Sequence, residues 1–377
     1  MLLTIIVFLI ILGVLIFAHE LGHFVTARRS GVRAEEFGFG FPPRVFGFYK
    51  KAGKWNFVWG KKPVEADDTV YSLNLIPLGG FVKIKGEDGG HIEEQDSFPS
   101  KKWFTRIKIL AAGVIMNFLL AWLLIWIVMM LGIPESVDNS QNKYPDSKIQ
   151  IAEVVSGTPA EVAGIQIGDQ ILKQQTIAGE EVLFTNVEKF QQFVEGHKSQ
   201  EFELTLKRGS EVVQVSVSPR TEFPDDQGAL GVSLVETSLF RYSFFRGLWE
   251  SLLTVFSLIG AMLAGIYMII KQLLLGGSVG VEVTGPVGIA VMTKQVTQLG
   301  LVYILQFAAI LSINLGIINA LPIPALDGGR ILFILIERFK GSPISQKTEQ
   351  IFHTVGFMLL IGLMILVTFR DVWKIFS

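Results

Sequence analysis

Five long apolar stretches divide this chain and constrain its fold more than any other feature. Most of them approach the roughly 20 residues that an α-helix needs to cross about 30 Å of hydrocarbon. Half of the 377 residues are apolar and only 18% are charged, a balance too apolar for a soluble protein of this size. The sequence therefore predicts a multi-pass α-helical membrane protein in contact with the lipid bilayer. The stretches are residues 1–18, 107–131, 248–270, 301–320 and 354–369.

Cysteine content and net charge exclude several classes of protein. With no cysteine, the chain has no disulfide framework, no thiolate metal site and no cysteine nucleophile. The formal net charge of −1 gives no support to a nucleic-acid partner.

The polar segments between the apolar stretches differ in charge. Residues 26–108 contain 15 Lys and Arg against 10 Asp and Glu, whereas residues 132–243 contain 9 against 17. Cytoplasmic segments are enriched in Lys and Arg, and Arg28, Arg29 and Arg106 lie at the membrane ends. We therefore expect the first segment in the cytoplasm and the second outside it, in a protein of the plasma (inner) membrane.

The middle segment, from about residue 148 to 220, has the pattern of a compact, mostly β module. Apolar residues alternate in short runs that are typical of strands, among them 149–155, 202–206 and 213–217. The run 157–172 resembles the short helix and G-D-x-I-L turn of PDZ domains, which bind extended peptides by adding a strand to a sheet edge. The alternative is a folded spacer or size filter whose groove is not used.

A second β pattern lies within the basic segment. Residues 71–85 form two alternating runs around Pro77-Leu78-Gly79-Gly80, which predicts a β-hairpin. The runs are apolar enough to dip into the membrane, where a sheet edge must be buried in protein or line a cavity. A soluble hairpin is the alternative.

The strongest chemical signal is the sequence His19-Glu20-Leu21-Gly22-His23 at the end of the first apolar stretch. Two histidines four residues apart lie on one helical face, so both imidazoles can reach one Zn²⁺ ion, and the intervening Glu20 can act on water as a general base. Ionisable groups on a membrane helix are costly and usually functional. The alternative is a set of polar residues that only cap the helix at the interface.

A catalytic zinc site usually has three protein ligands and leaves a fourth position open. The segment 319–329 follows an apolar stretch, contains two prolines and two glycines that break the helix, and has Asp327 as its single carboxylate. Broken helices are tolerated at membrane depth where the backbone lines a cavity. We therefore expect Asp327 to be the third ligand, although zinc is not the sole divalent ion that this donor set can hold.

Across nearly the whole chain, the sequence resembles the site-2 protease family of intramembrane zinc metalloproteases, and closely the bacterial branch typified by the regulator-of-sigma-E protease. The motifs that carry the resemblance occur in order. They are the H-E-x-x-H helix, 37–40 (Phe-Gly-Phe-Gly), 76–83 (Ile-Pro-Leu-Gly-Gly-Phe-Val-Lys), Gly113 to Asn117, the PDZ-like run, 285–289 (Gly-Pro-Val-Gly-Ile) and 319–328 (Asn-x-x-Pro-x-Pro-x-Leu-Asp-Gly).

The resemblance implies an activity and a set of site residues. It implies regulated intramembrane proteolysis of single-spanning membrane proteins after a first extracytoplasmic cut, such as anti-sigma factors or remnant signal peptides, with one zinc ion per chain and Glu20 as proton carrier. It also implies that the hairpin pairs with an unwound substrate helix and that Asn319 holds substrate backbone. The expected substrate-binding residues are Asn319, Pro322, Leu73, Leu75, Gly79 and Gly80, and those of the PDZ peptide groove are Gly164, Ile165, Gly168 and Asp169. One departure is size: the best-known members carry two PDZ domains, whereas the space between residues 132 and 243 fits one.

Both halves of the metal site must meet at one depth, which tests the topology. With the β module outside, the helix 301–320 must run inward, which forbids a full crossing by 248–270 even though residues 251–270 carry no charge. We therefore expect four spanning helices, with 248–270 interfacial or re-entrant and the active site toward the cytoplasm. The expected divisions are 1–132 (N-terminal membrane half), 133–222 (PDZ domain), 223–300 (linker and interfacial helix) and 301–377 (C-terminal membrane half).

Two other functions remain open. A membrane-anchored peptide-binding scaffold would carry a degenerate metal site, but all four residues of the expected site are intact. A metal transporter would need several ionisable residues along a path through the bundle, and the apolar stretches offer almost none beyond the cluster named above.

Overall fold

The computed structural model describes residues 2–87, 90–137, 146–172, 174–177, 180–209, 211–224, 227–275, 285–342 and 344–376. The chain divides into two compact units. The first comprises residues 1–126, 248–294 and 305–377, and the second comprises residues 127–247 and 295–304. Five helices in the described ranges are long and apolar enough to cross a membrane, which agrees with the expected polytopic protein with an inserted β unit.

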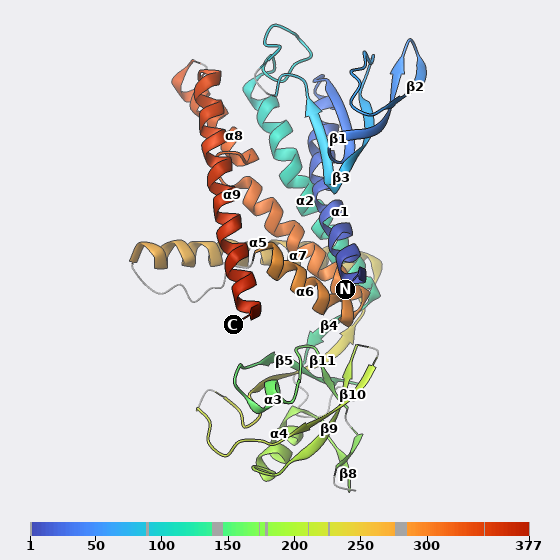
Figure 1. The fold of residues 1–377 in the computed structure, drawn as a ribbon, viewed down its shortest axis with the longest axis vertical. Coiled ribbons are helices and arrows are strands. Elements are labelled where there is room, and N and C mark those ends of the chain that lie inside the picture. The colour runs from blue at the N-terminus through green and yellow to red at the C-terminus, as the bar shows by residue number, and fades with distance from the viewer. Residues whose placement is uncertain are drawn as a thin grey trace. The chain divides into compact units, whose positions relative to one another are not determined.

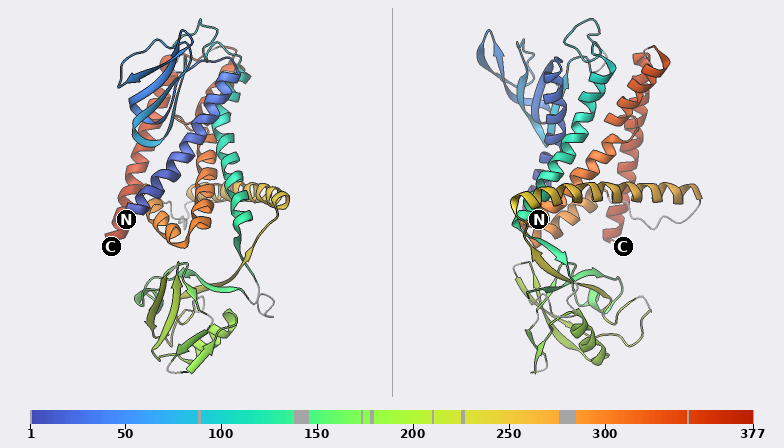
Figure 2. Two further views of the ribbon diagram at one scale, coloured as in Figure 1. Left: turned by 90° about the vertical axis from the view of Figure 1, so that its right-hand side faces the viewer. Right: turned by 180° about the vertical axis from the view of Figure 1, so that it is seen from behind.

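The helices of the first unit follow the apolar stretches closely. In Figures 1 and 2, α1, α2, α7 and α9 run alongside one another, whereas α5 runs across them. The helices are α1 (Leu2–Arg29), α2 (Trp103–Leu131), α5 (Phe244–Leu275), α6 (Pro286–Leu299), α7 (Leu301–Ala320), α8 (Asp327–Lys340) and α9 (Gln346–Phe376).

Small residues bring α1, α2 and α7 into close contact. A Cβ atom at Gly22 of α1 would lie 2.3 Å from the carbonyl oxygen of Ala112 in α2. A Cβ atom at Gly316 of α7 would lie 2.8 Å from the ring of Phe118 in α2. Membrane helices associate through such small-residue contacts because lipid supplies no hydrophobic driving force between them. The glycines therefore hold the three helices together at the depth of the histidine pair.

A three-stranded sheet of β1 (Ala34–Lys51), β2 (Lys54–Trp59) and β3 (Val70–Ile84), in the order β2-β1-β3, lies beside α1. The predicted hairpin is corrected here. The two runs of β3 lie on opposite sides of β1, because Phe37 of β1 pairs with Val82 on one side and with Tyr71 on the other. Gly38 permits this insertion, since a Cβ atom there would lie 2.3 Å from Ser72 Oγ.

The second unit is mostly β, as expected. Its six-stranded sheet has the order β10-β9-β6-β5-β11-β4, and a separate ribbon pairs β7 with β8. The strands are β4 (Ile133–Ser136), β5 (Lys148–Val154), β6 (Gln170–Ile171), β7 (Gln174–Ile177), β8 (Glu180–Leu183), β9 (Phe202–Arg208), β10 (Glu211–Val217) and β11 (Val232–Phe240), and the helices are α3 (Pro159–Val162) and α4 (Val187–Gly196).

The core of the second unit is formed by the alternating apolar residues of its strands, with Ile149, Leu204 and Leu206 almost fully buried. The sheet extends beyond the expected domain limit at residue 222. Strand β11 pairs antiparallel with β5, from Val232 opposite Val154 to Thr237 opposite Lys148. The segment expected to be a linker, 223–300, therefore includes a strand of this sheet.

Candidate metal centre and its surroundings

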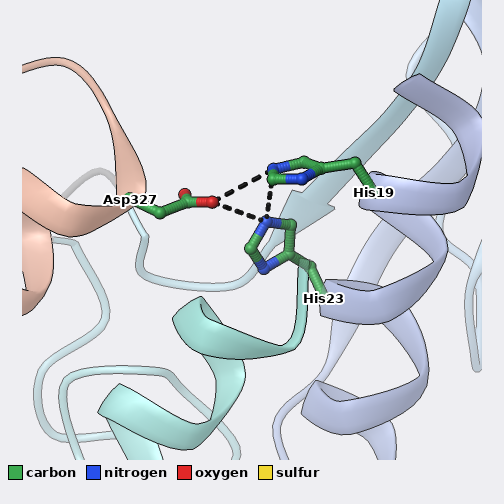
Figure 3. Close-up of side chains that lie close together, drawn as sticks. All are labelled: His19, His23 and Asp327. Atoms are coloured by element: carbon green, nitrogen blue, oxygen red, sulfur yellow. Dashed lines mark hydrogen bonds and ion pairs between the residues drawn. The ribbon is translucent and has the colours of Figure 1, made fainter. Parts of the chain in front are cut away.

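The helical spacing of His19 and His23 brings both imidazoles to one point, and Asp327 meets them there (Figure 3). The three side chains come from the C-terminal half of α1 and the first residue of α8. His19 Nε2 lies 3.1 Å from His23 Nε2, and Asp327 Oδ2 lies 3.0 Å from the first and 3.3 Å from the second. Both histidines are buried.

These separations fit a tetrahedral metal ion. Zinc bonds of about 2.0 Å in tetrahedral geometry place neighbouring ligand atoms about 3.3 Å apart. Two imidazole nitrogens and one carboxylate oxygen form a donor set typical of catalytic zinc. The three residues can therefore hold one divalent ion and leave a fourth position open.

The outer nitrogen of each histidine has a partner that fixes its ring. His23 Nδ1 lies 2.9 Å from the carbonyl oxygen of Ile109 in α2, so this nitrogen donates and leaves Nε2 free to bind a metal. His19 Nδ1 lies 3.1 Å from the side-chain amide of Asn117 in α2. Helix α2 therefore orients both imidazoles.

The hydrogen-bond network assigns the orientation of the Asn117 amide. With its nitrogen toward His19, the buried Oδ1 atom of Asn117 has no partner. In the reverse orientation Oδ1 accepts a hydrogen bond from His19 Nδ1, and the amide nitrogen takes the position without a partner. Only this orientation places the proton on Nδ1 and frees His19 Nε2 for a metal. We therefore assign the oxygen to the His19 side. Ser312 of α7 donates to the backbone oxygen of Asn117 at 2.8 Å and ties a third helix to this point.

Glycines make room for the cluster. A Cβ atom at Gly113 of α2 would lie 2.4 Å from His23 Nε2, so only glycine fits there. A Cβ atom at Gly328 or Gly329 would lie 2.2 Å from a carbonyl oxygen of the loop before α8, at Leu321 and Ile323 respectively. The two glycines after Asp327 thus let α8 begin tight against that loop.

The surroundings of Asp327 determine whether its carboxyl group is ionised. Burial raises the pKa of the Asp327 carboxyl, but the adjacent imidazoles of His19 and His23 outweigh burial and hold this pKa well below its usual range. The residue is therefore ionised and able to bind a cation.

Glu20 lies at the same turn of α1 and is half-buried. The Gly79-Gly80 segment of β3 packs against this part of the helix. A Cβ atom at Gly80 would lie 2.8 Å from Phe17 Cα and 3.2 Å from Glu20 Cβ, while one at Gly79 would lie 2.3 Å from Ile16 Cβ. Both expected hairpin glycines thus bring the sheet into contact with α1 beside Glu20.

The other expected substrate-binding residues lie on two elements. Leu73 and Leu75 on β3 are exposed, at 40% and 63%. Asn319 is half-buried in the last turn of α7, and Pro322 is exposed in the loop before α8. None of these four residues is among the three ligand residues of the cluster.

The residues expected to form a peptide groove lie in turns of the second unit. Gly164 and Ile165 follow α3, and Gly168 and Asp169 precede β6. Asp169 is fully buried and pairs with Arg208, whose Nη2 lies 2.7 Å from Asp169 Oδ2. A cavity of about 430 Å³ lies elsewhere in this unit, lined by residues of α4 and β11 and by the loop 228–230.

Sequence reasoning named His19, Glu20, His23 and Asp327 but gave no role to the residues that orient them. Asn117 and Gly113 were noted only as parts of a motif. The two residues are four positions apart in α2, so a glycine and an amide lie one turn apart on the same helix face. In a membrane helix this pattern indicates a face where another helix packs closely and makes a polar contact.

Comparison with known proteins finds a peptidase family and several proteases with similar sequences. The sequence model of Peptidase family M50 matches residues 7–363. A putative zinc metalloprotease of Clostridium perfringens is 32% identical, with 97% of each chain aligned. The regulator of sigma-W protease RasP of Bacillus subtilis is 29% identical over 99% of each chain, and a putative zinc metalloprotease of Fusobacterium nucleatum is 30% identical over 99% of this chain and all of its own.

Proposed function

The chain belongs to Peptidase family M50, and from that premise we propose that His19, His23 and Asp327 hold a zinc ion with which Glu20 hydrolyses peptide bonds inside the membrane. The observation that carries the proposal is the convergence of two Nε2 atoms and one carboxylate oxygen at 3.0 to 3.3 Å, where α1, a candidate membrane span, meets the first residue of α8. The names of the relatives agree with zinc as the metal.

The catalytic roles follow from the donor set. When bound, zinc supplies a Lewis acid that polarises the scissile carbonyl and activates water. Glu20 takes a proton from the attacking water and delivers it to the leaving amine, since it lies on the same helical turn as the ligands without being one of them. Asn117 and the Ile109 carbonyl hold the two imidazoles in the required orientation.

The substrate must be unwound, because the hydrogen bonds of a helix shield its peptide bonds. An unwound stretch at membrane depth needs new partners for its backbone groups. The β1–β3 sheet beside Glu20 supplies strand-pairing partners, with Leu73 and Leu75 contacting substrate side chains and Gly79 and Gly80 setting the distance to α1. Asn319 and Pro322 contact the substrate backbone from the side of α7.

Single-spanning membrane proteins that have already been cut outside the cytoplasm, such as anti-sigma factors and remnant signal peptides, fit this site as substrates. We expect the reconstituted protein to cleave a single-spanning model substrate with a short extracytoplasmic stub. The same spanning segment with its full extracytoplasmic domain should be cleaved at least about tenfold more slowly, since a bulky domain hinders entry. Fragment quantification by gel and mass spectrometry measures both rates. Equal rates would contradict the requirement for a first cut.

The second unit is proposed to be a single extracytoplasmic PDZ domain within residues 133–240, which extends the expected limit of 222 to include β11. The turn that contains Gly164, Ile165, Gly168 and Asp169 was the expected groove, but Asp169 is buried against Arg208 and unavailable to a ligand. The cavity between α4 and β11 suits an extended peptide better, because strand addition needs an open strand edge. Within the described residues β4 pairs with β11 only from Thr237 to Phe240, so the part of β11 at Val232 and Leu234 is open on that side.

The topology is proposed from charge and from the site. Asp327 lies beside the histidines of α1, so α7 must run inward, and α5 then cannot complete a crossing. The course of α5 across the other helices supports an interfacial or re-entrant position. This leaves four spanning helices, with the site toward the cytoplasm.

Because the chain has no cysteine, single cysteines can test the topology directly. We expect Glu211→Cys in the second unit to react with a membrane-impermeant maleimide in intact spheroplasts. Lys54→Cys at the β1–β2 turn and Lys340→Cys at the end of α8 should react only after permeabilisation; all three residues are exposed. Labelling of Lys340→Cys in intact spheroplasts would mean that α5 crosses the membrane.

A further inference from the structure

The six-residue loop 321–326, between α7 and α8, directly precedes Asp327 and determines where this carboxylate lies. Within it, Ala325 has a φ of 76°, the left-handed region that residues with a Cβ atom rarely adopt. Such a conformation persists only where the surrounding structure holds it. The contacts of Ala325 and its neighbours therefore hold the loop in this conformation.

Helix α9 supplies the first of these contacts. The backbone N–H of Ala325 donates a hydrogen bond to Nδ1 of His353, with a nitrogen–nitrogen distance of 2.8 Å. Because Nδ1 accepts, the proton of the neutral imidazole is on Nε2. No sequence pattern assigns a role to His353, and it lies outside the group of candidate metal ligands.

A glycine one turn further along α9 supplies the second contact. A Cβ atom at Gly356 would lie 2.4 Å from Cβ of Pro324 and 2.7 Å from its carbonyl oxygen. The backbone of α9 thus touches the loop directly, and His353 and Gly356 lie on the same face of the helix. On the other side, Gly329 of α8 packs against the carbonyl oxygen of Ile323. The loop thus contacts α8 on one side and α9 on the other.

We propose that His353 is a positioning residue of the metal centre, which fixes Ala325 through its Nδ1 atom and thereby directs the carboxylate of Asp327 at His19 and His23. Gly356 makes this contact possible by letting α9 approach the loop. The inference rests on the proposed function, since it assumes that the cluster binds zinc. It assigns α9, which contributes no ligand, a part in assembling the site.

Two substitutions of His353 separate positioning from simple packing. In His353→Asn, the amide oxygen can occupy the place of Nδ1 and accept from Ala325, whereas in His353→Gln the amide lies near the place of Nε2. The two differ by one methylene group. Zinc affinity of the purified, full-length protein, measured by competition with a chromogenic chelator, is the readout, and gel filtration in detergent and thermal unfolding check the fold.

We expect His353→Asn to bind zinc within about threefold of the wild type and His353→Gln and His353→Ala to bind about 10- to 100-fold more weakly, the usual cost of losing an outer partner of a metal site. Wild-type affinity in folded His353→Gln and His353→Ala would overturn the proposal, as would a loss in His353→Asn equal to that in His353→Ala. Failure of the wild type to bind zinc would instead overturn the proposed function.

Discussion

Replacing Glu20 with Gln is expected to abolish cleavage while leaving zinc binding intact. Gln has the size of Glu but cannot take a proton, and general acid–base groups contribute about 10² to 10⁴ in rate. Because Glu20 is not among the ligand residues, metal content should stay at one ion per chain. Cleavage of the truncated model substrate and zinc content by atomic emission are measured on the same preparation.

The matched control for this variant is Glu211→Gln in the second unit. Glu211 is an exposed side chain at the start of β10, and it does not line the cavity between α4 and β11. This variant should cleave at the wild-type rate. Retention of more than about a tenth of the wild-type activity in Glu20→Gln would mean that another group carries the proton.

Replacing Asp327 with Asn is expected to remove both zinc and activity. The neutral amide loses the charge attraction to the metal, and at 3.0 to 3.3 Å from the two histidine nitrogens it can instead hydrogen-bond to them and close the site. The loss of zinc affinity should exceed about 100-fold, which is the upper limit for an outer partner. Chelator competition measures it, and proteolysis of the detergent-solubilised protein checks the fold.

Asp68→Asn serves as the control for this second variant, because Asp68 is about half exposed and pairs with Arg28 at the surface. It should bind zinc as the wild type does. If Asp327→Asn retained both zinc and activity, the third ligand would lie elsewhere, and the inward course of α7 would lose its support.

The sequence could predict the helices and the ligand residues because each is a local pattern. Long apolar runs give membrane helices by length alone, and the spacing of His19 and His23 gives a shared helical face. Asp327 could be found because it is the single carboxylate in a helix break at the right depth. These inferences need no knowledge of how distant segments pack.

The residues missed by sequence reasoning depend on packing between segments far apart in the chain. Asn117 lies 98 residues from His19, and no local pattern pairs them. The same holds for His353, which meets Ala325 only because α9 packs against the loop. The β3 runs resembled a hairpin because each alternates correctly, but alternation does not reveal that Phe37 lies between them.

The central claim is that this cluster is a zinc centre that cuts peptide bonds within the membrane, and the position of the cut tests it most directly. The wild type is reconstituted in liposomes with the truncated single-spanning substrate, stripped of metal by a chelator, and reloaded with stoichiometric Zn²⁺. Intact-mass analysis of the fragments should place the cut inside the spanning segment, absent after stripping and restored by zinc. A cut outside that segment, or one that survives complete removal of metal, would contradict the account.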